Sequence, residues 1–511
     1  MLSNEIVEKA VVVNFGGQYA HLIARRIRER GVYAEIIQPE DVEKVAKNPE
    51  VKAIILSGGP SSVYHSVAPD IPDEVFQLGK PVLGICYGHQ LIAKKLGGEV
   101  RRGKGEYGKT LVRLVEKDPI FDGWEAEEVV WMSHEDYVAQ PPPGFSVLAV
   151  SENGYVAAMH KGHIYGVQFH PEVAHTAKGG LLLENFLRKV AKITDFWRPE
   201  DQIGRIVEEI RRKATEGDVI VGVSGGVDST VTAVLVHMAV GERAHAIFID
   251  HGLFRDGEPE QVVALLNSLG VKVHVIDARE RFLRRLEGVS DCEEKRRIVG
   301  ETFAEVFAEA VARFPNARYL AQGTLYPDVI ESGAVKGADK IKSHHNVGGL
   351  PPWFSLSLVE PLREFYKDEV RKIAKALGLP DEVVYRHPFP GPGLAVRIIG
   401  PFTKEKLEIV RKATKIVEEE LEKAGLLRKV WQAFAVVGDD KWVGVKGDRR
   451  AVGYVVTVRV VESEDAMTAD WAKLPYDVLE KISARITSEI PQVTMVAYAT
   501  TTKPPSTIEP C

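Results

Sequence analysis

Short apolar runs that alternate with amphipathic segments organise the first part of the chain. Residues 11–14, 53–56 and 81–85 each read as a buried strand, and residues 19–31 follow a helical pattern that ends at a glycine. Strands that are apolar along their whole length are typical of a parallel sheet covered by helices on both faces. Residues 1–195 are therefore predicted to form a doubly wound α/β domain.

The same alternation begins again after a short connection at residues 196–202. Helical patterns alternate here with apolar strands, which lie at 219–223, 246–250, 271–276 and 318–321. The first of these strands runs directly into a glycine-rich segment and then into a helical pattern over 230–240. In such sheets, ligands bind beyond the carboxyl ends of the strands. Residues 196–385 are predicted to form a second doubly wound domain.

The last stretch, residues 386–511, has a different pattern. It opens with three prolines and two glycines within 386–393, which restrict the chain to extended or turning geometry. Alternation with period two predicts strands that bury one face, and it lies at 430–437 and 454–462. Helices are predicted over 403–424 and 474–490, with a last strand over 494–500. The fold class predicted for the whole chain is α/β, with two doubly wound parallel-sheet domains and a small C-terminal α+β domain.

Composition and charge narrow the function classes. The chain has 511 residues, which is more than one hydrophobic core normally supports. It carries 72 acidic and 66 basic residues, and neither end is strongly basic, which argues against a sequence-independent nucleic-acid binder. No apolar run approaches the roughly 20 residues that span a bilayer, and the first residues do not resemble a signal peptide. We expect a cytoplasmic protein without nucleic-acid or membrane partners.

The chain has three cysteines, Cys86, Cys292 and Cys511, and no Cys-x-x-Cys pair. A disulfide framework or a zinc site is therefore not expected, and a reducing cytosol fits this cysteine usage. Cys511 is interpreted as a free terminal thiol without a catalytic part. Cys86 is different, because the residues around it are typical of a catalytic nucleophile.

A first candidate site follows the strand at 81–85 and reads Gly84-Ile-Cys86-Tyr-Gly88-His-Gln90. Glycines on both sides of the cysteine leave room for the strained turn of a nucleophile elbow. The start of a helix just after Cys86 favours its thiolate form. The alternative is a buried structural cysteine, which is the commoner fate of a single cysteine.

The segment His170-Pro171-Glu172 strengthens the catalytic interpretation. Pro171 keeps the segment out of a helix interior, and in an extended chain positions i and i+2 point to the same side. The carboxylate of Glu172 is then able to orient the imidazole of His170 beside Cys86, which is the arrangement of a catalytic triad. The alternative is a surface turn that has this sequence by chance.

Backbone amides near the cysteine complete the first site. Gly58 and Gly59 follow a predicted strand, and their amides, together with that of Tyr87, are candidates for an oxyanion hole. A simple Gly-Gly-Pro turn explains the two glycines equally well.

The segments 57–60, 84–90 and 167–172 resemble the class I glutamine amidotransferase family. The resemblance implies that the cysteine attacks the side-chain amide of glutamine, that the histidine protonates the departing ammonia, and that water then releases glutamate. One detail departs from the family. Such domains in this subfamily usually read Asp-Phe-Gly after the first strand, whereas this chain reads Asn14-Phe-Gly-Gly17, where Asn makes similar local hydrogen bonds.

The second candidate site is Ser224-Gly-Gly-Val-Asp-Ser229, between a buried strand and a helix. Its glycines let backbone amides converge on an anion, and the helix start adds positive potential. The loop lacks the Gly-Lys-Ser/Thr of a Walker A loop, and a plain glycine-rich turn is the alternative. It resembles the loop of the ATP pyrophosphatases, which implies that it holds pyrophosphate as the leaving group. The predicted ATP-binding residues are Ser224, Gly225, Gly226, Val227, Asp228, Ser229, Thr230 and Lys342.

Asp228 is also the predicted ligand of Mg²⁺, which takes one or two carboxylates in addition to the phosphates of ATP. Residues 333–340 are small and polar, as suits a lid. Lys336, Lys340 and Lys342 would then bring positive charge to the phosphates. A solvated loop explains these lysines equally well.

The loop alone does not identify which substrate ATP activates. Four further segments indicate it. Residues 321–332, 341–350, 386–393 and 503–509 resemble the glutamine-hydrolysing GMP synthetase family, and the resemblance spans nearly the whole chain. It implies that the substrates are glutamine, ATP and xanthosine 5′-monophosphate (XMP). The residues implied to bind XMP are Arg296, Gln432, Asp448, Arg450, Lys503 and Glu509. The tail ends Glu-Pro-Cys where this family usually reads Glu-Trp-Glu.

The implied reaction has two halves. Glutamine is hydrolysed to ammonia in the first domain, and ATP adenylates XMP in the second. Ammonia then displaces AMP to give GMP, with AMP and pyrophosphate as the other products. The third domain is expected to pair two chains into a homodimer and to complete the nucleotide site.

Two alternatives stay open at this point. One is another glutamine-dependent, AMP-forming ligase, such as one that makes NAD, but such enzymes usually carry an unrelated amidase in place of the Cys86 domain. The other is a nucleotide-binding relative without catalysis. The intact Cys86, His170, Glu172 and Asp228 argue against it.

Overall fold

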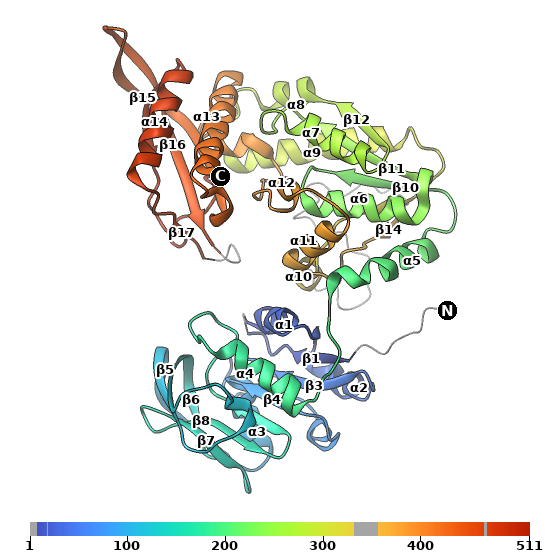
Figure 1. Cartoon of the computed structure of the whole chain (residues 1–511), viewed down its shortest axis with the longest axis vertical. Coiled ribbons are helices and arrows are strands. Elements are labelled where there is room, and N and C mark those ends of the chain that lie inside the picture. The colour runs from blue at the N-terminus through green and yellow to red at the C-terminus, as the bar shows by residue number, and fades with distance from the viewer. Residues whose placement is uncertain (1–7, 18, 332–355, 464–467) are drawn as a thin grey trace. The chain divides into compact units, whose positions relative to one another are not determined.

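The computed structural model describes residues 8–17, 19–331, 356–463 and 468–511. The chain divides into two compact units, Met1–Arg198 and Pro199–Cys511 (Figure 1). No helix within the described ranges is long and apolar enough to cross a membrane. The predicted lid and its three lysines lie outside the described residues.

The first unit contains one sheet with the strand order β2-β1-β3-β4-β9-β8-β7-β5-β6. The first five strands in this order pair in parallel, as the continuous apolar runs predict. They are β1 (Lys9–Val13), β2 (Tyr33–Ile37), β3 (Val51–Leu56), β4 (Val82–Ile85) and β9 (Ile164–Val167). The helices of this unit are α1 (Ala20–Glu29), α2 (Val42–Ala46), α3 (Tyr87–Lys95) and α4 (Gly179–Asn185).

The other four strands of this sheet pair antiparallel, so the sheet is mixed rather than wholly parallel. They are β5 (Glu99–Leu114), β6 (Glu127–Gln140), β7 (Ser146–Ser151) and β8 (Val156–Lys161). The long hairpin of β5 and β6 was not predicted. Its strands alternate buried and exposed residues and carry many charges, because an antiparallel extension leaves one face in water.

The second unit begins with a wholly parallel sheet in the order β12-β11-β10-β13-β14. Its strands are β10 (Asp218–Val223), β11 (Ala244–Asp250), β12 (Val273–Asp277), β13 (Ala317–Ala321) and β14 (Ser357–Val359). The order reverses at β10, which therefore marks the switch point where such sheets bind ligands. The helices are α5 (Ile203–Lys213), α6 (Val227–Val240), α7 (Glu258–Ser268), α8 (Arg279–Leu286), α9 (Cys292–Val311), α10 (Tyr326–Glu331), α11 (Lys367–Ala376) and α12 (Asp381–Val384).

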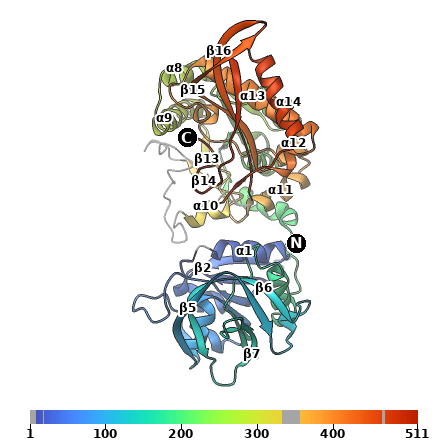
Figure 2. The same cartoon turned by 90° about the vertical axis from the view of Figure 1, so that its left-hand side faces the viewer.

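The C-terminal part of this unit is a smaller α+β layer. The predicted strands are the inner parts of a longer antiparallel hairpin, whose turn end extends beyond the neighbouring helices (Figures 1 and 2). Strand β18 pairs in parallel with β16. The elements are α13 (Lys404–Lys423), β15 (Gln432–Lys446), β16 (Arg449–Glu462), β17 (Asp470–Trp471), α14 (Tyr476–Glu489) and β18 (Val493–Tyr498).

One hydrophobic core joins the parallel sheet to this layer. Ile247 of β11 and Val299 of α9 belong to the same buried cluster as Val410 of α13 and Val456 of β16. Because burial of apolar surface is the main stabilising term in folding, the shared core explains why residues 199–511 form one unit. The predicted α/β fold class, with two parallel-sheet parts and a C-terminal α+β part, is confirmed.

Two candidate active sites

The first site is built on the turn between β4 and α3. Cys86 occupies this turn with a φ of 52°, a left-handed conformation that is rare for a residue with a Cβ and typical of a nucleophile elbow. Its amide donates to the carbonyl of Val167 at 2.8 Å, which ties the turn to β9. A Cβ on Gly88 would lie 2.3 Å from the carbonyl oxygen of Leu56, so only glycine lets α3 approach β3 this closely.

His170 and Glu172 follow β9 and lie beside the cysteine. The Nδ1 atom of His170 is 2.7 Å from Oε1 of Glu172, and both side chains are buried. This contact leaves Nε2 for the sulfur of Cys86, to which His170 is hydrogen-bonded. Burial opposes the imidazolium charge, but Glu172 and Cys86 together raise the pKa of His170 well above its usual value. The predicted grouping of these three residues is therefore present in the structure.

The space around the sulfur is kept open by Gly58. A Cβ at this position would meet Cε1 of His170 at 3.2 Å and Cβ of Cys86 at 3.8 Å. Tyr87 is the first residue of α3, and the first amides of a helix have no acceptor within it. Gly59 follows in the same turn, against Phe15 and the ring of Tyr87. This placement fits the predicted oxyanion hole, which remains a prediction.

A buried pair that the sequence did not indicate braces β6 beside the cysteine. The carbonyl of Ser133 lies 3.7 Å from Sγ of Cys86. The next residue, His134, places Nε2 3.0 Å from Oε2 of Glu106, and both side chains are almost fully buried. Although burial raises the pKa of Glu106, hydrogen bonds led by that of His134 bring it below its usual value. The contacts join distant parts of the chain, so no local motif announces them.

The second site is the loop between β10 and α6. Gly225 has a φ of +84°, and Gly226 caps a helix that begins at Val227 rather than at Thr230. The hydroxyl of Ser229 accepts from the amide of Ser224 at 3.1 Å and donates to the carbonyl of Gly226 at 3.1 Å. These bonds close the loop around the helix start, where amides favour an anion. The Thr230 hydroxyl donates to the same Gly226 carbonyl at 2.9 Å.

Asp228 projects from the first turn of α6 and meets Lys367, the first residue of α11. Its Oδ2 is paired with the lysine ammonium. Its Oδ1 is buried and has no hydrogen-bond partner among the described residues. Gly323 packs against the backbone of Asp228, because a Cβ there would lie 3.1 Å from its carbonyl carbon. Lys367 was missed by sequence reasoning, since it lies in an ordinary-looking charged helix start.

The fit of Mg²⁺ to this site follows from the donor set. One free carboxylate oxygen suits a hard cation that completes its shell with phosphate oxygens and water. Within the described residues no cluster of three or more His, Cys, Asp or Glu side chains is able to hold a metal alone. The residues present therefore fit a metal that is bound together with a phosphate-bearing substrate.

Three of the predicted XMP-binding residues come together at the end of the chain. Glu509 accepts two hydrogen bonds from the buried Arg397, at 3.1 and 2.9 Å, and a third from Nε2 of Gln432 at 2.6 Å. Arg296 of α9 donates to the carbonyl of Cys511. Nη1 of Arg397 is buried and has no hydrogen-bond partner among the described residues.

The expectation that Cys511 is a free thiol is wrong. Cys511 and Cys292 form a disulfide, with their Cα atoms 5.3 Å apart. The two cysteines are 219 positions apart in sequence, and only the folding of the tail onto α9 brings them together. Cys86 is the free cysteine and is buried.

Two of the other predicted XMP-binding residues lie at the turn end of the β15–β16 hairpin. Asp448 sits in the two-residue turn of the β15–β16 hairpin with a φ of 64°, and Arg450 lies just after it. Gln432 begins β15, so the length of a 15-residue strand separates it from this turn. Lys503 forms an isolated bridge with Ala469 at the edge of the tail. Within one chain, Asp448 and Arg450 therefore do not join the cluster around Glu509.

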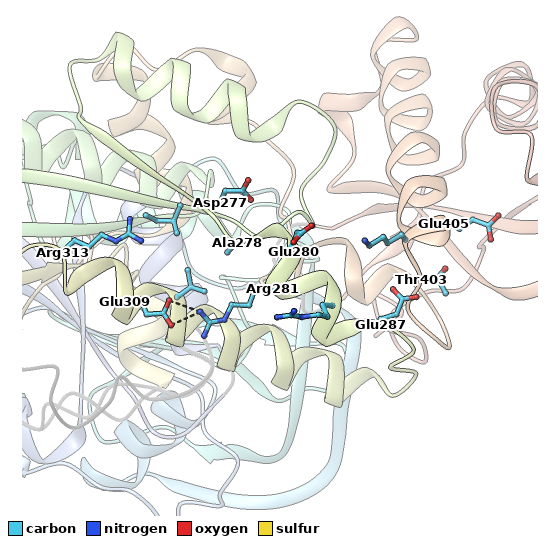
Figure 3. A pocket seen from close by; sticks show the side chains of 13 residues that line it. Asp277, Ala278, Glu280, Arg281, Glu287, Glu309, Arg313, Thr403 and Glu405 are labelled. Atoms are coloured by element: carbon cyan, nitrogen blue, oxygen red, sulfur yellow. Dashed lines mark hydrogen bonds and ion pairs between the residues drawn. The ribbon is translucent and has the colours of Figure 1, made fainter.

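A further hollow lies between α8, α9 and the start of α13 (Figure 3). Among its lining residues, Arg281 donates to Glu309 at 2.9 Å, and it also donates to Glu305 at 2.7 Å. Acidic and basic side chains alternate around the hollow, so no single ligand charge is favoured. It contains none of the predicted site residues.

Three family models match consecutive parts of this chain. Glutamine amidotransferase class-I matches residues 11–190, NAD synthase matches 200–310, and the GMP synthase C terminal domain matches 419–510. A glutamine-hydrolysing GMP synthase from Pyrobaculum aerophilum is 77% identical over 99% of this chain and 100% of its own length. GMP synthases of the same type from Aquifex aeolicus and Aeropyrum pernix are each 54% identical over 98% of both chains.

The chain belongs to the glutamine-hydrolysing GMP synthase family. This confirms the resemblance expected along the sequence, and with it a glutamine-dependent ligase. The NAD synthase match ends at residue 310, and the GMP synthase C terminal domain follows it. The likeness to NAD synthesis is thus confined to the ATP-handling part, and the alternative of an NAD-forming ligase is not favoured.

Proposed function

We propose that this GMP synthase relative hydrolyses glutamine at Cys86 and uses the ammonia to aminate ATP-activated XMP. The observation that carries the proposal is the pairing, in one chain, of a buried Cys-His-Glu set with a glycine-rich loop that holds a carboxylate. Neither half alone makes GMP from glutamine. The first supplies nitrogen, and the second primes the purine to receive it.

The first half-reaction uses a thiolate and an imidazolium. Sγ of Cys86 attacks the side-chain carbonyl carbon of glutamine, and the amides of Gly58, Gly59 and Tyr87 receive the developing oxyanion. His170, protonated at Nε2 and held by Glu172, gives its proton to the departing nitrogen. Water then hydrolyses the thioester and releases glutamate.

The second half-reaction uses the loop from Ser224 to Ser229. The C2 oxygen of XMP attacks the α-phosphorus of ATP, and pyrophosphate leaves into the amides at the start of α6. Asp228 would hold Mg²⁺, which neutralises phosphate charge when bound. Lys367 pairs with the Asp228 carboxylate and adds a positive charge near the departing pyrophosphate. Ammonia then displaces AMP, which leaves far more readily than a purine oxo group.

XMP is proposed to bind at the end of the chain, near Arg296, Gln432 and Glu509. Together they offer the carboxylate of Glu509, the amide of Gln432 and the guanidinium of Arg296. A purine with several polar edges and a phosphate suits such a set. Gln432 also donates to the carbonyl of Pro388 at 3.0 Å, and Arg386, two residues earlier, donates to the carbonyl of Gly225 at 3.1 Å. The segment 386–388 therefore links this region to the pyrophosphate loop within one unit.

A homodimer is proposed to complete the XMP site. Val443, Val445 and Val452 are 51%, 77% and 60% exposed. Val443 pairs with Val452 and Val445 with Arg450, so all four side chains share one face of the hairpin. Contiguous exposed apolar side chains mark interaction sites. A second copy that covers this face would receive Asp448 and Arg450, which one chain cannot bring to its own Glu509.

The deciding experiment counts products. The protein is incubated with glutamine, Mg-ATP and XMP, and nucleotides, glutamate and pyrophosphate are quantified together. We expect GMP, AMP, pyrophosphate and glutamate in equal amounts. Formation of ADP and orthophosphate would contradict the assigned loop, and aminated product from a different acceptor would contradict the assigned substrate.

A further inference from the structure

The disulfide between Cys292 and Cys511 joins two elements that carry predicted XMP-binding residues. Cys292 opens α9, directly after the helix cap Asp291, and Cys511 ends the chain. Their Cα separation of 5.3 Å lies inside the range of natural disulfides. Arg296 is four residues beyond Cys292 and so lies on the same face of α9, whereas Glu509 is two residues before Cys511.

The rest of the tail has its own anchors. Arg459 is buried and donates to the carbonyls of Thr501, Thr507 and Ile508 at 2.9 to 3.0 Å. Arg397 and Gln432 hold the Glu509 carboxylate. Beyond Glu509, the disulfide and the contact of Arg296 with the Cys511 carbonyl anchor the tail. Both of these anchors involve Cys511, so the bridge contributes directly to holding residues 510–511 on α9.

The contact of Arg296 with the tail gives the bridge a functional consequence. While the bridge is closed, the Cys511 carbonyl accepts from Arg296, which fixes the guanidinium next to the Glu509 segment. When the bridge opens, no covalent link holds Cys511 against α9, and Arg296 loses a fixed acceptor. Glu509 then depends on Arg397 and Gln432 alone. The distance between the arginine and the carboxylate is no longer set by a covalent link.

We propose that the Cys292–Cys511 disulfide is a redox-dependent positioning device for XMP. The inference rests on the proposed function of this site and adds a control to it. Closure removes two protons and two electrons from the thiols, and a disulfide oxidant takes them up by thiol–disulfide exchange and becomes two thiols. The closed form presents Arg296 and Glu509 in a fixed arrangement, and the open form binds XMP more weakly.

The test compares oxidised and reduced protein in ammonia-driven synthesis. Ammonium salt as nitrogen donor keeps the Cys86 thiol out of the readout. Thiol titration in denaturant should count one free thiol in the oxidised chain and three after reduction, from the three cysteines present. Reduction should raise the KM for XMP about tenfold, the factor for a site that is correctly arranged about a tenth of the time. The KM for Mg-ATP should not change.

Two variants make the assignment specific. Cys511→Ser and Cys292→Ser should each show the raised KM for XMP and should no longer respond to reductant. Three free thiols in the untreated protein, or equal XMP kinetics in both redox forms, would overturn the inference while leaving the proposed function intact. An equal rise in KM for XMP and for Mg-ATP would also overturn it, because that result would show that the disulfide stabilises the whole unit and does not position the XMP site specifically.

Failure of the proposed function is recognised separately. If no redox form makes GMP, XMP affinity is measured by titration calorimetry on both forms. Tighter XMP binding by the oxidised form then supports the positioning device without catalysis. Equal binding, or none, removes it.

Discussion

At the residue scale, the protonation state of the first site is set by the contact between His170 and Glu172. The two side chains are buried 2.7 Å apart, where a carboxylate stabilises an imidazolium much more strongly than in water. The raised pKa of His170 means that its charged form persists to higher pH than the ordinary value of 6.5. The imidazolium is therefore available as the acid for departing ammonia at neutral pH.

A pH profile checks this arrangement. Because the pKa of His170 is raised, the alkaline decline of glutaminase kcat/KM should lie above pH 6.5. Glu172→Gln removes the stabilising charge, so the decline should move to lower pH and kcat should fall by about a hundredfold or more. An unchanged alkaline limb in this variant would show that another group governs it. Ammonia-driven synthesis by the same variant is the control and should be retained.

The division of labour between the two sites predicts a second residue-level result. Cys86→Ala removes the nucleophile, so glutamine-dependent GMP synthesis should fall by several orders of magnitude, while synthesis from ammonium salt remains. Asp228→Ala removes the proposed Mg²⁺ ligand, so synthesis with either nitrogen donor should be lost. A folded Cys86→Ala variant that also lost ammonia-driven synthesis would contradict separate sites.

At the scale of elements, the first site depends on how closely α3 packs on the sheet. A Cβ at Gly88 would overlap the backbone of Leu56, and one at Gly84 would lie 2.5 Å from the backbone of Gly88. These glycines allow the helix start to sit over the ends of the strands. The position of the Cys86 turn thus comes from close packing as much as from its own backbone strain.

A matched pair of glycine substitutions tests this packing. Gly88→Ala should destabilise the first unit by about 1–3 kcal/mol, the usual cost of overpacking, and should lower glutaminase activity. Gly204→Ala in α5 is the control, because a Cβ there meets nothing within 4 Å. Because alanine loses less backbone entropy than glycine in a helix, Gly204→Ala should leave the free energy of unfolding unchanged or raise it by roughly 0.5–1 kcal/mol. Thermal unfolding of both variants gives the comparison, and equal midpoints would contradict the packing argument.

Hydrophobic patterns predicted some of the strands in the first unit and missed others. The parallel strands β1, β3 and β4 were predicted because each contains a continuous apolar run. The hairpin of β5 and β6 was not, because its charged, alternating residues have no run of buried positions. Its pairing depends on partners in other segments, and this hairpin carries Ser133 to the cysteine.

At the scale of the whole molecule, the uncovered face of the β15–β16 hairpin is the feature that one chain leaves unexplained. Its three exposed valines and Arg450 share a face. Asp448 and Arg450 lie at the far end of the hairpin from Glu509. A symmetric dimer would cover the apolar face and supply these residues in exchange.

A charge placed on this face should separate the subunits. Val445→Asp should shift the protein from dimer to monomer in analytical ultracentrifugation, because burying an unpaired carboxylate costs several kcal/mol. GMP synthesis should fall through a raised KM for XMP, while glutaminase activity stays. Val115→Asp, at another exposed valine, is the control. A Val445→Asp dimer of unchanged mass would place the interface elsewhere.

The sequence alone identified the two catalytic loops and the histidine and glutamate that accompany the cysteine. The Cys86 elbow, the His170-Pro-Glu172 segment and the Ser224–Ser229 loop are each complete within seven or fewer residues. Their roles follow from spacing and backbone constraint, so they were found without a structure. The sheets that hold them followed from apolar periodicity for the same reason.

Tertiary structure decided everything that joins distant positions. Lys367 reaches Asp228, Arg397 reaches Glu509, and Cys511 reaches Cys292, across sequence separations that no local pattern encodes. The cysteine count argued against a disulfide, and the fold overturned that expectation by laying the tail on α9. Pairing between remote side chains depends on which surfaces the hydrophobic core brings together, and that outcome belongs to the folded chain as a whole.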